Sequence, residues 1–223
     1  MLKLFVIIPA YNEEKTIAPV VRGVFASNPD AQVVVVDDGS SDKTARLAKE
    51  SGAVVLQHVI NRGQGAALQT GNTYALRAGA DVIVHFDADG QFEPREISKL
   101  VEPIVRAEAE VALGSRFLKN NAIPLSKKYL ILPLARLVNF IFTGLWLSDA
   151  HNGFRAMTGR AAGLIKINQD RMAHNSEIVR QIKEKKLSFV EVPVTVHYHR
   201  YGQGIGGGLK IIKDLVFQKL AGG

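Results

Sequence analysis

Four short apolar runs in the first half of the chain have the pattern of strands that are buried on both faces. They lie at Leu4–Ile8, Val33–Val36, Val54–Gln57 and Val82–Phe86, and they are rich in β-branched residues. A continuous apolar run is typical of a parallel sheet that helices cover on both sides. We therefore expect these runs to form the centre of such a sheet.

Three stretches with helical patterns separate these runs. They lie at Glu13–Ala26, Asp42–Glu50 and Gln64–Ala78. Asn12 is a good N-cap for the first helix, and Gly79 suits the end of the third. The alternation of strand and helix predicts an open, doubly wound α/β sheet, in which ligands bind outside the carboxyl ends of the strands.

The second half of the chain is less regular. A helix is expected from Pro94 to Ala107, a strand at Val111–Leu113, a helix around Ser176–Lys185 and a strand-like run at Ser188–His197. We find no linker or repeat, so the sequence predicts a single domain over residues 1–223.

Two apolar segments of the second half suggest a membrane surface. Leu130–Leu147 would be about 27 Å long as a helix, slightly less than a hydrocarbon core of ~30 Å, and it contains Arg136. We interpret it as a buried or membrane-surface helix. Leu209–Leu220 is amphipathic, and Lys127, Lys128, Lys210 and Lys213 are placed to face anionic head groups. A dimer interface or ordinary core packing explains the apolar stretch equally well.

Polar residues follow three of the expected strands. The segments are Pro9-Ala10-Tyr11-Asn12-Glu13, Asp37-Asp38-Gly39-Ser40 and Asp87-Ala88-Asp89-Gly90-Gln91. Because the carboxyl ends of parallel strands meet at one edge, we expect these segments to lie together.

The segment after the fourth strand has the chemistry of a metal site. Asp87 and Asp89 can both reach one hard cation, and Gln91 can add an oxygen. Mg²⁺ is often held in this way between carboxylates and substrate phosphates. An Asp-x-Asp pair alone is more often an ordinary acidic turn. Its place after an apolar strand, beside two other polar strand ends, favours the metal site.

The acidic pair after the second strand has two interpretations. One carboxylate can hydrogen-bond a ribose hydroxyl or a base, as acidic strand ends do in nucleotide-binding folds. Alternatively, Asp38 and Ser40 only cap the following helix. Both interpretations can hold if different residues take each role.

Composition narrows the class of protein. The 223 residues are 47% hydrophobic and carry a net charge of +7, which suits an anionic partner without identifying it. Cysteine is absent, which excludes disulfides and thiolate chemistry. Gly63-Gln64-Gly65 lacks the third glycine of a dinucleotide fingerprint, because position 68 is Leu. Candidate phosphate ligands are Arg116, Lys127, Lys128, Arg155 and Arg200.

Taken together, the motifs resemble family 2 glycosyltransferases of the GT-A fold. The three polar segments and Gly114-Ser115-Arg116 carry this resemblance through their order and spacing. Within the family the chain is similar to dolichol-phosphate and polyprenol-phosphate sugar synthases. That similarity rests on Ser148-Asp149-Ala150-His151-Asn152-Gly153-Phe154-Arg155, Glu177 and Val192-Pro193-Val194. Arg200-Tyr201-Gly202-Gln203-Gly204 departs from the family pattern, because it lacks a Ser-Lys pair.

The resemblance implies a role for each matching residue. Mg²⁺ or Mn²⁺ would be held by Asp87, Asp89 and Gln91, and Asp89, Arg116 and Asp149 would be the catalytic residues. The residues expected to bind the nucleotide-sugar are Pro9, Ala10, Tyr11, Glu13, Asp38, Asp87, Ala88, Asp89, Arg116, Arg155 and Arg200.

The expected function is inverting transfer of a hexose from a GDP- or UDP-sugar to a polyprenyl phosphate. Residues 1–116 would form the nucleotide-sugar half and residues 117–223 the acceptor half. We expect a cytoplasmic protein that is peripheral on the inner face of the membrane, with a membrane-protein partner or a homodimer as options and no nucleic acid. If the acceptor is a hydroxyl, a base becomes valuable, with Asp149 first and His151 second. A sugar-phosphate nucleotidyltransferase or a nucleotide-binding module would also be compatible with the α/β pattern.

Overall fold

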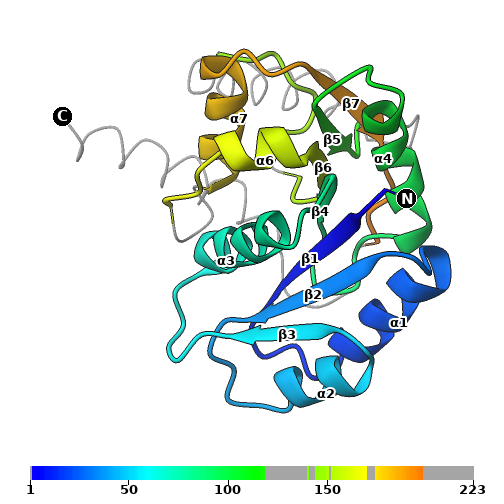
Figure 1. The fold of residues 1–223 in the computed structure, drawn as a ribbon, viewed down its shortest axis with the longest axis vertical. Helices are drawn as coiled ribbons and strands as arrows, with labels where there is room; N and C mark the ends of the chain where they lie inside the picture. Colours follow the sequence, from blue (N-terminus) through cyan, green and yellow to red (C-terminus); the bar gives the residue numbers. More distant parts are fainter. Residues whose placement is uncertain (1, 119–139, 141–143, 151, 170–173, 198–223) are drawn as a thin grey trace, which may run out of the picture.

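A computed structural model describes residues 2–118, 140, 144–150, 152–169 and 174–197. In these ranges seven strands form one sheet in the order β3-β2-β1-β4-β6-β5-β7 (Figure 1). β6 runs antiparallel to both its neighbours, and the other pairs are parallel. The strands are β1 (Leu4–Ala10), β2 (Gln32–Asp37), β3 (Val54–Gln57), β4 (Val82–His85), β5 (Val111–Ser115), β6 (Arg155–Thr158) and β7 (Phe189–Pro193).

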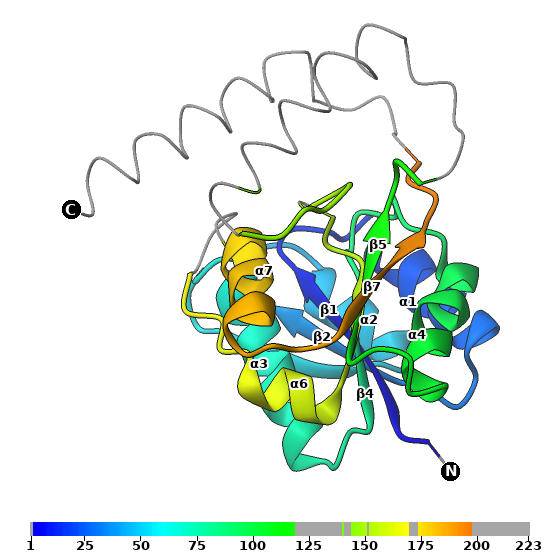
Figure 2. The ribbon, with the colours of Figure 1, turned by 90° about the horizontal axis from the view of Figure 1, so that it is seen from above.

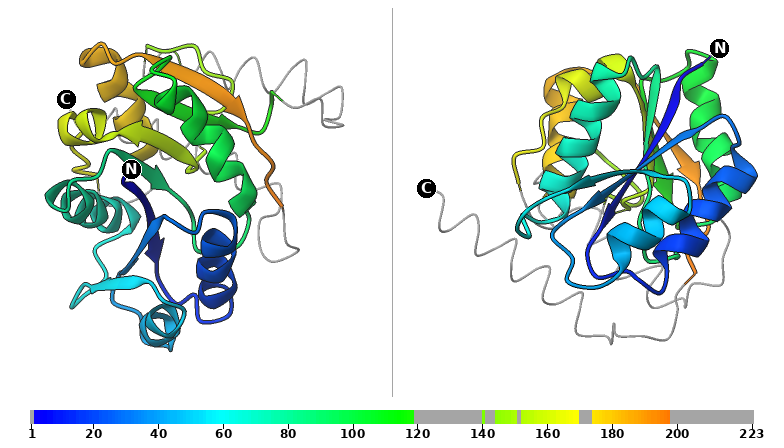
Figure 3. Two further views of the ribbon diagram at one scale, coloured as in Figure 1. Left: turned by 45° about the vertical axis from the view of Figure 1, so that its right-hand side comes forward. Right: turned by 60° about the horizontal axis from the view of Figure 1, so that its bottom comes forward.

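Helices cover both faces of the sheet. α1, α2 and α4 pack on one face and α3, α6 and α7 on the other, as Figures 2 and 3 show for the larger helices. The predicted α/β class, with a mainly parallel sheet, is therefore confirmed. The helices are α1 (Ile17–Ser27), α2 (Thr44–Glu50), α3 (Gln64–Arg77), the 3-10 turn η1 (Pro94–Glu96), α4 (Ile97–Val105), α6 (Gly159–Leu164) and α7 (His174–Glu184).

Three of the four apolar runs, in β1, β2 and β4, are buried on both faces as the sequence indicated. The expectation is wrong for Val54–Gln57, because β3 lies at the edge of the sheet and its residues are exposed or half-buried. Along β1, Val6 and Ile8 point into the core beneath α1 and α4, whereas Phe5 and Ile7 point into the core beneath α3. All four side chains are fully buried. Each such side chain contributes roughly 1.5–3 kcal/mol relative to exposure, so this pattern fixes the register of the central strands.

The first helix begins later than expected. It starts at Ile17, and Asn12 does not cap it. Instead Asn12 adopts a positive φ of 56° and joins the loop after β2: its N–H donates to Ser40 Oγ and its Oδ1 accepts from the Ser41 N–H. Because Asn12 makes these hydrogen bonds with the loop after β2, it lies outside the helix, which begins five residues later. The second helix likewise starts at Thr44, after Asp42.

Two elements of the second half were not expected from the sequence. β6 inserts between β4 and β5, and α6 follows it directly. The expected apolar helix at 130–147 lies mostly outside the described residues, and the amphipathic segment at 209–220 lies wholly outside them. Among the helices that the structure does describe, none has the length and apolar character needed to cross a bilayer.

Candidate active site

The three polar strand ends meet at one edge of the sheet, as predicted. β1 lies between β2 and β4, so the segments that follow these strands are neighbours. The Asp38 N–H donates to Ala10 O, and the Phe86 N–H donates to Ile7 O. The edge therefore brings together the loop after β1, the acidic end of β2 and the turn after β4.

The turn after β4 presents two carboxylates that keep partial access to solvent. Asp87 Oδ1 accepts a hydrogen bond from Gln64 Nε2 at 3.0 Å, and Asp89 Oδ1 accepts from the Gln91 N–H at 2.9 Å. Gly153 lies against this turn, because a Cβ built on it would be only 2.9 Å from Asp87 Oδ2. A glycine there leaves the carboxylate its space.

The carboxylates of Asp87 and Asp89 lie close enough in this turn to repel each other. Burial raises the pKa of Asp87 to about 7, and the negative charge of Asp89 adds to the effect, whereas the positive charge of Arg155 opposes it. A divalent cation would remove this repulsion, so the pair fits such an ion. Within the described ranges, no group of three His, Cys, Asp or Glu side chains is arranged to hold a metal. Two carboxylates suit Mg²⁺, which usually keeps water and substrate phosphates as its other ligands.

Arg155 lies in the interior, not at the surface. It is 1% exposed and donates to Asn152 O at 3.0 Å, to Gly153 O and to Asn175 Oδ1. Burial lowers the pKa of its guanidinium to about 10, so it stays protonated at neutral pH. The structure thus places this side chain in the interior, because β6 begins at Arg155 and directs it inward, and its expected role as a diphosphate ligand stays a prediction. Its charge acts on Asp87 from within the protein.

Asp38 is almost fully enclosed by hydrogen-bond donors. It is 3% exposed and accepts from His58 Nδ1 at 2.6 Å, from the Arg62 N–H at 2.9 Å and from the Gly63 N–H at 2.7 Å. A carboxylate has about four acceptor positions, so one remains for a ligand. Asp38 does not cap α2, so that interpretation is wrong for this residue. Asp42 instead accepts from the Thr44 N–H at the start of that helix.

The loop after β1 mixes buried and exposed residues. Pro9 and Ala10 are buried in β1, where they pair with the last residues of β2, whereas Tyr11 is 50% exposed. The Glu13 N–H donates to Thr44 Oγ1, and its carboxylate accepts from Thr16 Oγ1. Of this segment, the Tyr11 ring is thus the large side chain that faces solvent at the sheet edge.

Arg116 and Asp149 form an ion pair with two parallel hydrogen bonds at the end of β5. Arg116 Nε donates to Asp149 Oδ2 and Arg116 Nη2 to Asp149 Oδ1, both at 2.7 Å. The Arg116 side chain is 29% exposed and that of Asp149 only 2%, so the guanidinium covers the carboxylate. Two expected site residues, His151 and Arg200, lie outside the described residues.

Glu191 of β7 supports this ion pair from behind. Its carboxylate accepts from the Ser148 N–H at 2.9 Å, from Ser148 Oγ at 2.6 Å and from the Asp149 N–H at 3.4 Å. Sequence reasoning missed Glu191, and also His58 and the side chain of Gln64. Each acts through a partner from a different element, so no local motif marks it.

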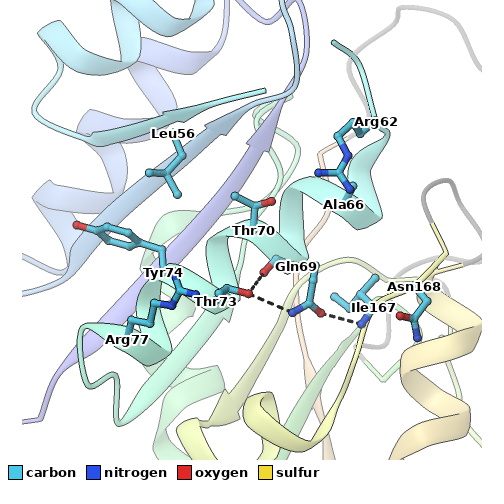
Figure 4. Close-up of a pocket in the computed structure, with 10 residues that line it drawn as sticks. All are labelled: Leu56, Arg62, Ala66, Gln69, Thr70, Thr73, Tyr74, Arg77, Ile167 and Asn168. Atoms are coloured by element: carbon cyan, nitrogen blue, oxygen red, sulfur yellow. Dashed lines mark hydrogen bonds between the residues drawn. The ribbon is translucent and has the colours of Figure 1, made fainter. Parts of the chain in front are cut away.

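A cavity of about 590 Å³ lies along α3 (Figure 4), and neither Asp87 nor Asp89 is among the residues that line it. Arg62, Thr70, Tyr74 and Arg77 are among the residues that line it. Thr70 also contacts His58, with 2.9 Å between its Oγ1 and His58 Nε2. This wall of the cavity is therefore connected to Asp38.

Comparisons with known proteins identify the family. The sequence model of the family described as glycosyl transferase family 2 matches residues 5–168. A UDP-N-acetylglucosamine–dolichyl-phosphate N-acetylglucosaminyltransferase of Methanococcus voltae is 34% identical over 244 residues, covering 97% of this chain and 96% of that one. A polyprenol monophosphomannose synthase of Mycolicibacterium smegmatis is 30% identical over 205 residues, covering 86% and 77% respectively.

The fold has a close counterpart among solved structures. A crystal structure of glucosyl-3-phosphoglycerate synthase from Mycobacterium tuberculosis, in complex with Mn²⁺, UDP-glucose and phosphoglyceric acid, has a TM-score of 0.71 and 21% sequence identity. The match covers 99% of this chain and 79% of that one, and it confirms the GT-A fold. The chain belongs to glycosyl transferase family 2 and is a glycosyltransferase of the GT-A fold.

Proposed function

We propose that this glycosyltransferase moves a hexose from a nucleoside-diphosphate sugar to a polyprenyl phosphate, with inversion at the anomeric carbon. The observation that carries the proposal is the crowded carboxylate pair of Asp87 and Asp89 at the ligand-binding edge of the sheet. Relatives that are 34% and 30% identical over most of the chain are named for dolichyl-phosphate and polyprenol substrates, which supports the acceptor.

In this proposal Asp87 and Asp89, with Gln91, hold Mg²⁺ or Mn²⁺ together with the donor's diphosphate. The ion, when bound, offsets the charge that develops on the leaving nucleoside diphosphate. Gln64 orients Asp87, and Gly153 keeps the space beside it open. Asp38 keeps one acceptor position for the nucleoside, and the exposed ring of Tyr11 lies at the same edge.

Arg116 is proposed to meet a phosphate at the end of β5. Asp149 holds its Nε and Nη2, so the guanidinium is fixed in orientation before substrate arrives. A lipid phosphate is already anionic near neutral pH, and its attack needs positioning more than a strong base. We therefore assign Asp149 to positioning for a phosphate acceptor. A base role belongs to the alternative in which the acceptor is a hydroxyl of a saccharide or small molecule.

Peripheral binding to the cytoplasmic face of a membrane is part of the same proposal. The net charge of +7, the lysines just before the segment at 130–147 and those within the amphipathic segment at 209–220 support attraction to anionic lipid. Co-sedimentation with vesicles of phosphatidylglycerol and phosphatidylcholine tests this part. Equal recovery of the protein with anionic and neutral vesicles would contradict it.

The function is tested by a donor screen with a short polyprenyl phosphate, read by product mass. UDP-N-acetylglucosamine, UDP-glucose and GDP-mannose are offered with Mn²⁺ and again with EDTA. We expect one donor to give a glycosyl phosphopolyprenol only when the metal is present. Absence of transfer to the polyprenyl phosphate from every donor would count against this acceptor class, and equal product formation in EDTA would contradict the proposed role of Asp87 and Asp89.

A further inference from the structure

A buried row of polar side chains joins the middle of α3 to the end of β2. His58 stands at its centre, with Nδ1 at 2.6 Å from Asp38 Oδ1 and Nε2 at 2.9 Å from Thr70 Oγ1. The side chains of His58 and Asp38 are only 8% and 4% exposed. The imidazole ring therefore bridges a carboxylate and a hydroxyl in a place that solvent hardly reaches.

The row continues from Asp38 toward the β4 turn. Asp38 accepts from the backbone N–H groups of Arg62 and Gly63, which directly precede α3. Gly63 has a φ of 93°, so the chain turns sharply there before the helix begins at Gln64. Gln64 then donates to Asp87 Oδ1 at 3.0 Å. Every link between His58 and the carboxylate of Asp87 is thus a hydrogen bond or a short piece of backbone.

We propose that His58 is a positioning residue for the donor site. Its ring fixes the rotation of the Asp38 carboxylate, and Asp38 in turn fixes the loop that places Gln64 against Asp87. A terminal carboxylate torsion is soft by itself, so an aligned partner is needed to hold it in one orientation. The inference rests on the proposed function in one respect, namely that Asp38 and Asp87 serve the nucleotide-sugar.

Two variants separate positioning from a merely structural role. His58→Phe keeps an aromatic ring of similar size but removes both hydrogen bonds. His58→Asn keeps an N–H near the position of Nδ1, so it can still donate to Asp38. The matched control is Thr73→Val on α3, the helix that also carries Thr70. The Thr73 hydroxyl donates to Gln69 O and makes no hydrogen bond with His58 or Asp38.

The first readout is amide hydrogen exchange in the substrate-free protein. We expect His58→Phe to speed exchange at Arg62 and Gly63 by about tenfold to a hundredfold, the range for losing a hydrogen bond to a charged group. His58→Asn should restore most of the protection, and Thr73→Val should leave it unchanged. Unchanged exchange at these two amides in His58→Phe would overturn the proposal.

The second readout is kinetic. His58→Phe should raise the KM for the donor by about tenfold or more while the KM for the acceptor stays near the wild-type value. A lower unfolding temperature with unchanged donor KM would instead show a purely structural role and overturn the proposal. If His58→Phe does not fold, Thr70→Val removes the far hydrogen bond of the ring and takes its place in both assays.

The two readouts keep this inference separate from the proposed function. Amide exchange needs no substrate, so it tests the link from His58 to the loop even if no donor is turned over. An enzyme that transfers no sugar but shows the expected exchange pattern would contradict the function alone. An active enzyme in which His58→Phe leaves amide exchange at Arg62 and Gly63 unchanged would contradict the inference alone.

Discussion

The turn after β4 and the ion pair at the end of β5 both carry aspartates, but their surroundings differ. From the described residues, Asp87 accepts one hydrogen bond, from Gln64. Asp149 accepts two from the Arg116 side chain, one from the Arg116 N–H and one from Asn152 Nδ2. The Asp87 carboxylate thus has few hydrogen-bond donors around it, whereas all four acceptor positions of the Asp149 carboxylate are used.

This difference separates two uses of an acid at the same sheet edge. A carboxylate that is crowded by like charge and has few donors favours a cation, whereas one that is filled with donors fixes its neighbours. Asp38 is intermediate, because His58, Arg62 and Gly63 supply three donors and one acceptor position remains.

Asp87→Asn should have the largest effect on activity. It removes one charge from the proposed metal site, and we expect transfer to fall by about a thousandfold, because metal ions supply several kcal/mol of charge stabilisation in such reactions. Steady-state transfer with Mn²⁺ measures this. Asp30→Asn, at an exposed turn, is the control. Near-normal transfer by Asp87→Asn would remove the basis for the metal site.

The same substitution should stabilise the metal-free protein above neutral pH. Burial and Asp89 raise the pKa of Asp87 from 3.8 to about 7 in the folded state. The folded protein therefore holds a proton that the unfolded chain has released, and stability falls as pH rises from about 4 to about 7. Asp87→Asn lacks this penalty, so thermal unfolding in EDTA should show a gain at pH 8 and little at pH 4. A gain of 1 kcal/mol corresponds to roughly 2–4 °C.

Asp149→Asn distinguishes a positioning acid from a base. If Asp149 only orients Arg116, we expect the KM for polyprenyl phosphate to rise by about tenfold, with kcat reduced less. Loss of a general base would instead lower kcat by about 10²–10⁴-fold and change its pH profile. Kinetics with a short polyprenyl phosphate, measured from pH 6 to 9, decides between the two roles.

The contrast between these carboxylates shows what the sequence could and could not predict. The four apolar runs appear in the structure as strands within one or two residues of their expected ends. For β1, β2 and β4 the reason is that burial on both faces leaves a continuous apolar pattern, whereas β3 is a half-exposed edge strand. The convergence of Asp38 and Asp87 followed from the rule that parallel strand ends meet at one edge.

The number of donors around each carboxylate was not predictable, because the donors come from distant parts of the chain. Asp38 is held by the N–H groups of Arg62 and Gly63, and backbone groups have no sequence signature. The inward direction of Arg155 was not predictable for the same reason. It depends on a hydrogen bond to Asn175 of α7 and on the place of β6 in the sheet. The neighbours of this four-residue strand, β4 and β5, lie far from it in the sequence. Tertiary packing therefore decides the role of each polar residue.

Gly153→Ala should weaken the metal site without unfolding the protein. The added Cβ would lie 2.9 Å from Asp87 Oδ2, closer than real contacts allow, so the carboxylate must move. We expect Mn²⁺ affinity, measured by calorimetry with the nucleoside diphosphate present, to fall by about tenfold, which is 1.4 kcal/mol. Gly163→Ala in α6 is the matched control, because its Cβ would meet nothing within 4 Å. Equal affinities in the two variants would show that the close approach has no effect on the ion.

Glu191→Gln should have the smallest effect, and it tests the saturated side of the contrast. Gln keeps one acceptor oxygen for Ser148, so the turn at residues 148–149 loosens but remains. We expect the KM for polyprenyl phosphate to rise by only about threefold, while Mn²⁺ affinity at the β4 turn is unchanged. In a double-mutant cycle the effect should largely disappear in Asp149→Asn, because Glu191 acts through that residue. Additive effects would mean that Glu191 supports Arg116 by another route, and that filling Asp149 with donors is not what holds the guanidinium in place.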